Sequence, residues 1–140
     1  MSQLLEFIGN HVVLVMAFVA VLIAYVYALY SDKNTSYTRI NPDQLTRLVN
    51  KENAKIVDVR TPEAYSSGHI VNAVNIPLAE IESGKAKLSG LNKRPVVAYC
   101  DRGISSQRAC KQLSNQGISP VFNLSGGVQA WVADKLPLSK

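Results

Sequence analysis

The sequence is poor in the side chains that build metal sites. It contains two cysteines and two histidines among 140 residues. Cys100 and Cys110 do not form a Cys-x-x-Cys pair, and neither His11 nor His69 lies near a cysteine in the sequence. Because zinc sites need clusters of such ligands, the sequence predicts no metal site.

Charge is missing from one long stretch near the N-terminus. Residues 12–30 contain no charged residue, no amide, no glycine and no proline. As a helix they would reach about 28 Å, close to the hydrocarbon thickness of a bilayer. Residues 1–10 lack Lys and Arg, and no A-x-A site follows the run, which argues against a cleaved signal peptide. We therefore expect an uncleaved transmembrane helix, with the lipid bilayer as the partner of residues 12–30.

Basic residues are absent before this run and frequent after it. Glu6 is the only fixed charge of the N-terminal tail, whereas Lys33, Arg39 and Arg47 follow the run. The positive-inside rule then predicts a single-pass protein with its N-terminus outside and the remainder in the cytoplasm, as in a bacterial inner membrane. The remainder holds fifteen basic and nine acidic residues, a formal charge of +6. These charges are scattered, which is typical of a solvated surface and predicts no nucleic-acid partner.

The chain divides into three predicted parts. Residues 1–30 are the N-terminal tail and transmembrane helix, the polar residues 31–36 are a linker, and residues 37–140 are one domain. In the domain, short β-branched runs alternate with segments of helical periodicity, which predicts an α/β fold with a mainly parallel sheet and helices on both faces. We expect strands at 37–40, 55–59, 73–76, 96–99 and 121–124, and helices after Asn41, at 62–66, 78–83 and 85–91, from Ser105 or Ser106 to Gln116, and from Gly126 or Gly127.

The stretch PVVAYCDRGISS, residues 95–106, is the strongest candidate site. Cys100 ends the buried strand at 96–99, and a short loop with Gly103 leads into a helix. Backbone N–H groups and the helix dipole converge on such a position, so the arrangement favours a thiolate and any anion brought to it. In the reducing cytoplasm, Cys100 and Cys110 are expected to be one reactive thiol and one core residue, not a disulfide.

Three segments in order resemble the rhodanese family: IVDVRTPEAYSSGHIVNAVNIPL at 56–78, VVAYCDRGISS at 96–106 and FNLSGGVQAW at 122–131. The resemblance covers about residues 37–135 and implies a five-stranded parallel sheet flanked by helices. It also implies sulfurtransferase activity. Cys100 would take a sulfane sulfur from a small donor such as thiosulfate, carry it as a persulfide, and pass it to a thiol or protein acceptor without any cofactor.

The loop after Cys100 departs from the family pattern at one position. The family often has Cys-x-x-Gly-x-Arg followed by Ser or Thr, but Ser105 stands where that pattern has Arg. Asp101 would oppose thiolate formation and anion approach unless it is paired, and Arg102 is the candidate replacement for the missing charge. We therefore expect persulfide chemistry with altered use of thiosulfate. The resemblance assigns substrate binding to the whole loop: Asp101, Arg102, Gly103, Ile104, Ser105 and Ser106.

Other candidate residues have a structural interpretation that we favour. Asp58 and Arg60 either line the pocket or form an ion pair that fixes the loop, and the ion pair is preferred. His69 is expected to be a hydrogen-bonded structural residue and not a general base. Cys110 is expected in the core and not as a resolving thiol. The pair Gly126–Gly127 is expected to allow close packing of a helix and not to bind an anion.

Two other function classes remain open. A non-catalytic interaction module would explain both the altered loop and the anchor. Alanines at 17, 20, 24 and 28 form a small-residue stripe that would suit a membrane-protein partner. A phosphatase or arsenate reductase is the third class, but such enzymes usually have a longer loop that ends in Arg, which Ser105 contradicts.

Overall fold

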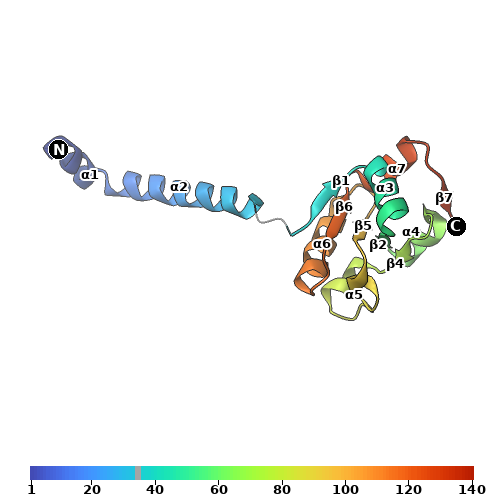
Figure 1. Ribbon diagram of the computed structural model, residues 1–140. Coiled ribbons are helices and arrows are strands. Elements are labelled where there is room, and N and C mark those ends of the chain that lie inside the picture. The colour runs from blue at the N-terminus through green and yellow to red at the C-terminus, as the bar shows by residue number, and fades with distance from the viewer. Residues whose placement is uncertain (34–35) are drawn as a thin grey trace. The chain divides into compact units, whose positions relative to one another are not determined.

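The computed structural model describes residues 1–33 and 36–140. The chain separates into two compact units, Met1–Thr35 and Ser36–Lys140 (Figure 1). Each unit has its own internal packing.

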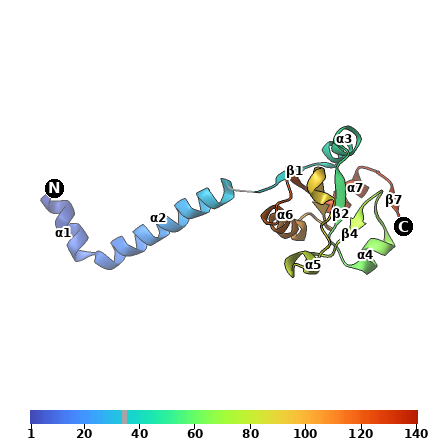
Figure 2. The same cartoon turned by 60° about the horizontal axis from the view of Figure 1, so that its bottom comes forward.

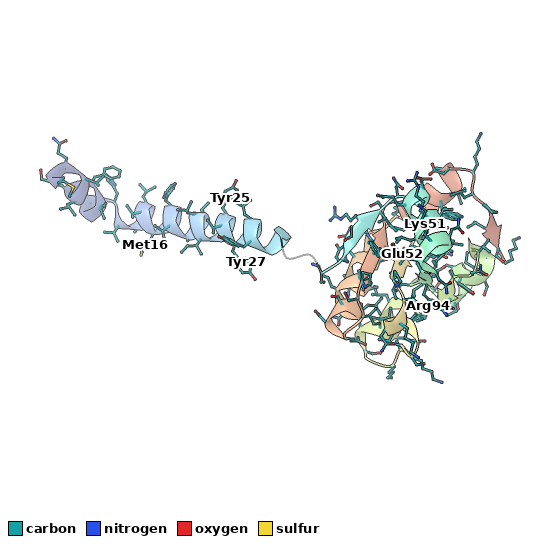
Figure 3. All side chains as sticks on the ribbon, in the orientation of Figure 1. Met16, Tyr25, Tyr27, Lys51, Glu52 and Arg94 are labelled. Atoms are coloured by element: carbon teal, nitrogen blue, oxygen red, sulfur yellow. The ribbon has the colours of Figure 1, made fainter. Side chains whose placement is uncertain are left out.

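The first unit consists of two helices. Helix α1 spans Ser2–Asn10 and α2 spans Val12–Lys33, with a break in backbone direction at His11. The segment Val12–Tyr30 is long and apolar enough to cross a membrane. Its side chains project outward along the helix, as Figure 3 shows for Met16, Tyr25 and Tyr27. This helix fits the predicted anchor, whereas its orientation and the cellular location stay predictions.

The boundary of α2 differs from the sequence-based expectation. The helix continues past Tyr30 to Lys33, so part of the predicted linker 31–36 is helical. Residues 34–35 of that linker lie outside the described residues. The predicted tail also contains α1, whose apolar residues lie near one side of a helix that has Glu6 on the other.

The second unit is built on a parallel sheet of five strands, in the order β1-β6-β5-β2-β4. This result confirms the predicted fold class. Every pair of neighbouring strands in the sheet is parallel, so the carboxyl ends of all five strands lie along the same edge. The strands are β1 Thr38–Ile40, β2 Lys55–Asp58, β4 Val74–Asn75, β5 Val96–Tyr99 and β6 Val121–Leu124.

Helices cover both faces of this sheet. Helices α3 (Pro42–Glu52) and α7 (Gly127–Ala133) pack on one face, and α5 (Leu78–Glu82) and α6 (Ser105–Asn115) pack on the other. Figure 2 shows α3 on one side of the strands and α5 and α6 on the opposite side. The short helix α4, Pro62–Ser67, follows β2 near the carboxyl edge of the sheet.

The central strand β5 explains why the core has two halves. All four of its side chains are buried. Val96 and Ala98 belong to the apolar cluster under α5 and α6, whereas Val97 and Tyr99 belong to the cluster under α3 and α7. Successive side chains of a strand point to opposite faces, so a continuous apolar run is what a strand covered on both faces requires.

Local capping sets where two of the helices begin. At the start of α3, the Asn41 side chain accepts a hydrogen bond from the Gln44 N–H at 2.8 Å, and the Gln44 side chain accepts one from the Asn41 N–H at 2.9 Å. This capping box satisfies two N–H groups that the helix cannot. At the start of α4, the Thr61 hydroxyl accepts from the Ala64 N–H at 3.3 Å. The second cap fixes the chain directly after Arg60.

One local prediction was wrong and one small element was missed. Residues 85–91 form no helix, and only a short 3-10 turn occurs at Leu91–Lys93. Gly84 and Gly90 bracket this stretch with positive φ angles of 75° and 87°, which helical backbone does not allow. The missed element is an antiparallel pair, β3 His69–Ile70 with β7 Leu138–Ser139, because two-residue strands carry no readable alternation.

Leu113 gives a direct test of this packing. It is fully buried on α6. Leu113→Ala should lower the free energy of unfolding by about 2–5 kcal/mol, because the cavity it leaves cannot close completely. The measurement is chemical unfolding of the full chain in detergent. Val132→Ala on the half-exposed side of α7 is the control, and an equal loss in both variants would contradict the described core.

Candidate functional site

The Cys100 sulfur lies in a cradle of hydrogen-bond donors. The backbone N–H of Gly103 points at the sulfur from 3.1 Å and that of Ser106 from 3.4 Å. The Ser106 hydroxyl oxygen is also 3.4 Å from the sulfur. Ser106 lies in the first turn of α6, so the helix dipole adds to the same effect. The two backbone N–H groups and the helix dipole stabilise negative charge on the sulfur.

The pKa of the Cys100 thiol reflects a competition between burial and these donors. The residue is only 4% exposed, and its burial raises the pKa because a thiolate loses hydration. Hydrogen bonds from the side chains of Ser105 and Ser106 and from the backbone of Ser106 and Arg102 lower it. The donors outweigh the burial, so the net pKa lies below the ordinary value of a cysteine.

Two glycines allow the loop to close over the sulfur. Gly103 has φ of 81°, and a side chain there would collide with the carbonyl of Leu124 and the N–H of Gly126. At Gly127, with φ of 57°, a side chain would collide with the carbonyl groups of Cys100 and Asp101. The N–H groups that follow Gly127 donate to those same carbonyls, from Val128 to Cys100 at 2.9 Å and from Gln129 to Asp101 at 3.1 Å. Gly127 therefore allows α7 to pack closely against the Cys100 loop, as expected.

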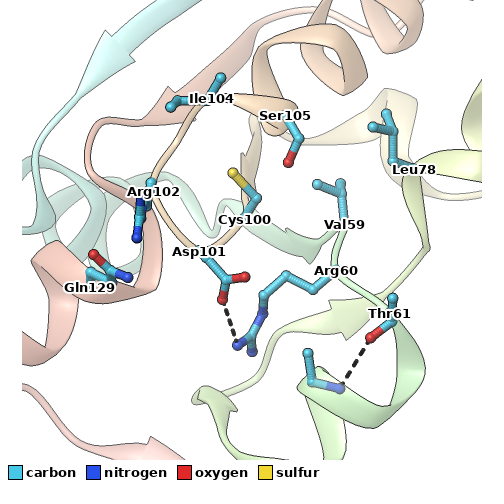
Figure 4. Close-up of a pocket in the computed structure, with 11 residues that line it drawn as sticks. Val59, Arg60, Thr61, Leu78, Cys100, Asp101, Arg102, Ile104, Ser105 and Gln129 are labelled. Atoms are coloured by element: carbon cyan, nitrogen blue, oxygen red, sulfur yellow. Dashed lines mark hydrogen bonds and ion pairs between the residues drawn. The ribbon is translucent and has the colours of Figure 1, made fainter.

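A cavity of about 590 Å³ opens above the sulfur (Figure 4). It is lined by residues from the predicted loop and from two distant segments. Gly103 and Ser106 lie beneath the sulfur and do not line the cavity, and Asp58 is buried behind Arg60. The lining residues are Val59, Arg60, Thr61, Ala64, Leu78, Cys100, Asp101, Arg102, Ile104, Ser105 and Gln129.

Asp58 and Arg60 form the buried ion pair that the sequence favoured. The guanidinium donates to both Asp58 carboxylate oxygens, at 2.7–3.0 Å, and to the Gly68 carbonyl at 2.6 Å. The Asp58 side chain is 0% exposed and that of Arg60 is 8% exposed. Burial alone would lower the pKa of Arg60, but the bonds to Asp58 and its charge raise it further above its usual value. Arg60 also lines the cavity, so the two sequence interpretations are both correct for this residue.

Arg60 balances part of the negative charge that Asp101 brings next to Cys100. One Arg60 nitrogen lies 3.4 Å from the Asp101 carboxylate, which is 65% exposed to solvent (Figure 4). The Asp101 side chain is drawn toward Arg60 and its charge is partly balanced there. The carboxylate is therefore turned to a cation at the cavity rim, and its repulsion of a thiolate is reduced.

Comparison with known proteins agrees with the fold. Residues 41–134 match the rhodanese-like domain. The chain belongs to this family. It is 30% identical over 139 residues to the protein YibN of Escherichia coli K12, covering 99% of this chain and 97% of YibN. It is 35% identical over 97 residues to the thiosulfate sulfurtransferase GlpE of Coxiella burnetii RSA 331, covering 69% of this chain and 89% of GlpE.

A solved structure gives the same result. The rhodanese homolog TT1651 of the extremely thermophilic bacterium Thermus thermophilus is 33% identical, with a TM-score of 0.55, over 66% of this chain and 98% of that one. The relatives of this rhodanese-like domain therefore include a sulfurtransferase, and the match to YibN extends over the apolar N-terminal helix as well.

Sequence reasoning missed several residues of the rhodanese-like site. Val59, Thr61 and Leu78 reach the cavity from the end of β2 and the start of α5, and Gln129 reaches it from α7. Their own side chains carry no catalytic or charged group that would mark them as site residues, so only the fold places them there. Asn123 on β6 was missed too, and its side chain bonds the Ser106 hydroxyl and the Gly103 carbonyl. A polar residue inside a buried apolar strand must be hydrogen-bonded, but the sequence does not indicate the partner.

The remaining candidates of the rhodanese-like domain have structural partners. His69 Nδ1 lies 3.0 Å from the Tyr65 carbonyl, and the two rings stack with their centroids 3.9 Å apart. Cys110 is fully buried, donates from its sulfur to the Phe122 carbonyl at 3.4 Å, and has its pKa raised to about 12, chiefly by burial. Within residues 1–33 and 36–140 no cluster of His, Cys, Asp or Glu could hold a metal ion.

The buried ion pair yields a stability prediction. Asp58→Ala leaves the Arg60 charge buried without its partner, so it should cost about 3–5 kcal/mol of unfolding free energy. Chemical unfolding of the full chain measures this loss. The exposed pair Asp43–Arg47 on α3 is the matched control, and Arg47→Ala should leave the unfolding midpoint nearly unchanged. A small loss for Asp58→Ala would contradict the role of the pair.

Proposed function

We propose that this protein is a membrane-anchored sulfurtransferase that carries a sulfane sulfur as a persulfide on Cys100. The observation that carries the proposal is the buried sulfur at the base of an open cavity, with two backbone N–H groups aimed at it. A lowered thiol pKa increases the thiolate fraction at neutral pH, and the thiolate is the attacking form.

The transfer is a displacement at sulfur. The Cys100 thiolate attacks the outer sulfur of a donor R–S–SH, a bond forms between the two sulfurs, and the donor bond breaks. The electron pair of the broken bond leaves with the inner sulfur as the thiolate RS⁻, which yields Cys100–S–SH. An acceptor thiolate then attacks the outer sulfur of this persulfide and regenerates the Cys100 thiolate. Charge and sulfur balance in both steps, and no redox cofactor is involved.

The charges around the cavity favour a persulfide donor over thiosulfate. Three charged side chains line it: Arg60, Asp101 and Arg102. Asp58 and Asp101 both pair with Arg60, and their two negative charges equal the positive charges of Arg60 and Arg102, so the site as a whole presents little net positive charge. A dianion gains little in such a site, whereas a donor with a neutral outer sulfur needs no cation beside the thiolate.

The apolar part of the cavity also supports this donor class. Val59, Leu78 and Ile104 line it beside the polar loop, and the volume of about 590 Å³ exceeds what an anion the size of thiosulfate fills. We therefore propose a small organic persulfide or a cysteine persulfide of a protein as donor, and a thiol as acceptor. Helix α2 would hold the domain at the cytoplasmic surface of a membrane, where a membrane protein can meet it.

The nucleophile can be tested with a pair of cysteine variants. After incubation of the full chain with an organic persulfide, intact-mass measurement should show one added sulfur atom in the wild type and in Cys110→Ser, but none in Cys100→Ser. The matched control works because Cys110 is buried and its pKa is raised. Persistence of the added sulfur in Cys100→Ser would end the proposal. If the wild type gains no sulfur atom, and binding of a partner protein survives Cys100→Ser, the non-catalytic interaction module would be favoured.

Ser105→Arg tests the donor preference. Ser105 lines the cavity directly beside Cys100, so an arginine there adds a cation where an anionic donor must approach. The variant should gain persulfide formation from thiosulfate by about tenfold or more, since one charge-assisted contact contributes about 1.5–3 kcal/mol. Rates with a neutral organic persulfide should change far less. Equal rates with both donors in the wild type would show that cavity charge does not select the donor.

A further inference from the structure

A buried chain of hydrogen bonds links Cys100 to strand β6. The Cys100 sulfur lies 3.4 Å from the Ser106 hydroxyl, which donates to the Asn123 side-chain oxygen at 2.5 Å. The Asn123 side-chain N–H donates to the Gly103 carbonyl at 3.1 Å. Cys100, Ser106 and Asn123 are all buried, so water does not compete at this level of the site. The chain therefore closes a ring beneath the loop that cradles the sulfur.

The orientation of the Asn123 amide is fixed by its partners. Its nitrogen must face the Gly103 carbonyl, because turning the amide would place two oxygens against each other. Its oxygen then faces Ser106 and can only accept a hydrogen bond. Asn123 is thus a permanent acceptor for the Ser106 hydroxyl.

The number of hydrogens in this chain of hydrogen bonds depends on whether Cys100 is a thiol or a thiolate. The Ser106 hydroxyl has a single hydrogen. When Cys100 is a thiol, its S–H can donate to the Ser106 oxygen while the hydroxyl hydrogen goes to Asn123. A thiolate has no hydrogen to give, so the Ser106 oxygen would face it with a lone pair. To stabilise the thiolate, the hydroxyl must rotate and leave the Asn123 oxygen.

We propose that Asn123 is a positioning residue that competes with the Cys100 thiolate for the single hydroxyl hydrogen of Ser106. The hydroxyl donates to the sulfur while it carries charge and returns to Asn123 when the charge has left with the donor's inner sulfur. The return half of this cycle rests on the proposed persulfide function, whereas the competition for the thiolate does not.

This competition limits the acidity of the nucleophile. A thiol that is too acidic is a weaker nucleophile, and attack is fastest when the thiol pKa is near the ambient pH. Burial raises the pKa of Cys100, and hydrogen bonds from the side chains of Ser105 and Ser106 and from the backbone lower it. While the Ser106 hydroxyl hydrogen stays on Asn123, the Ser106 side chain does not contribute to this lowering. The Ser106 hydrogen also gives the oxygen of Asn123 its partner whenever Cys100 is uncharged.

The charged and titratable groups near Cys100 come from three elements. Asp101 and Arg102 belong to its loop, Arg60 follows β2, and Cys110 faces it from α6. The ring formed with Ser106 and Asn123 does not use any of these four side chains in the contacts described above. A substitution at Asn123 therefore leaves these charges in place and changes only the competition for the Ser106 hydroxyl hydrogen.

The test is the pH profile of Cys100 alkylation in the full chain in detergent, read from the mass of its peptide. Asn123→Leu keeps the volume but removes the acceptor, so the Ser106 hydroxyl becomes free for the thiolate. The midpoint of the profile should fall to lower pH. At pH values below the midpoint, the thiolate fraction should rise about threefold, which is the effect of one modest hydrogen bond. Loss of mere structural support would instead weaken the cradle and move the midpoint up.

Two further variants separate the competing explanations. In a Ser106→Ala background, Asn123→Leu should have no effect on the midpoint, because the coupling passes through the Ser106 hydroxyl. Gln107→Leu is the matched control for loop support, since the Gln107 side chain donates to the same Gly103 carbonyl at 3.2 Å, whereas the Ser106 hydroxyl bonds Cys100 and Asn123. It should not lower the midpoint.

The outcomes decide the proposal in either direction. An unchanged or raised midpoint in Asn123→Leu, or the same shift without the Ser106 hydroxyl, would overturn it. If that variant does not fold, Asn123→Ala should lower the midpoint as well, and a raised midpoint there would overturn the proposal equally. Alkylation requires no sulfur donor, so a failure of sulfur transfer would leave this result standing and would count only against the proposed function.

Discussion

The carboxyl edge of the sheet depends on the hydrogen bonds and the ion pair that the buried Asp58 carboxylate forms. It accepts a hydrogen bond from the Tyr99 hydroxyl at 2.7 Å, which ties β2 to the end of β5 directly before Cys100. It also binds the backbone N–H and the guanidinium of Arg60. Without this carboxylate, one buried cation and one buried hydroxyl would lose their partner.

The same carboxylate shapes the electrostatics of the site. By holding Arg60, it directs the guanidinium to the Gly68 carbonyl and to Asp101 at the cavity rim. The acidic neighbour of Cys100 is thus turned to a cation, and the thiolate is stabilised from the other side by the N–H groups of Gly103 and Ser106. The structural and functional interpretations of the Asp58–Arg60 pair therefore describe one arrangement. The ion pair helps to fix the loop after Cys100, and the side chains of that loop determine the charge around the cavity that a sulfur donor enters.

Much of this fold could be predicted from the sequence. The alternation of β-branched runs and amphipathic segments indicates the order of strands and helices, and Asn41 followed by Pro42 marks the start of α3. The position of Cys100 at a strand end followed from the same pattern. The stretch 85–91 shows the limit, because its apolar residues Ala86 and Leu88 pack on the core from irregular backbone between two glycines. Periodicity alone does not distinguish this case from a helix.

The candidate site was predictable only where one segment carries it. The resemblance assigned substrate binding to the loop from Asp101 to Ser106, and four of its six residues line the cavity, whereas Gly103 and Ser106 donate to the sulfur from their backbone. The contributions of Leu78, Gln129 and Asn123 come from three other elements that the sheet topology brings to one edge. Their roles depend on distances across the fold, which neither composition nor spacing contains. The pairing of Asp101 with Arg60 is of the same kind, because a contact between residues 41 positions apart reduces the effect expected from adjacency alone.

Single-turnover transfer of an isotopically labelled sulfur tests the central account most directly. The full chain in detergent is mixed with an organic persulfide labelled in its outer sulfur, then with an excess of a thiol acceptor, and the Cys100 peptide is followed by mass spectrometry. The account predicts that label appears on Cys100 before it appears on the acceptor and leaves Cys100 at the rate at which the acceptor gains it. Label that reaches the acceptor without ever residing on Cys100, or that never reaches Cys100 at all, would contradict it.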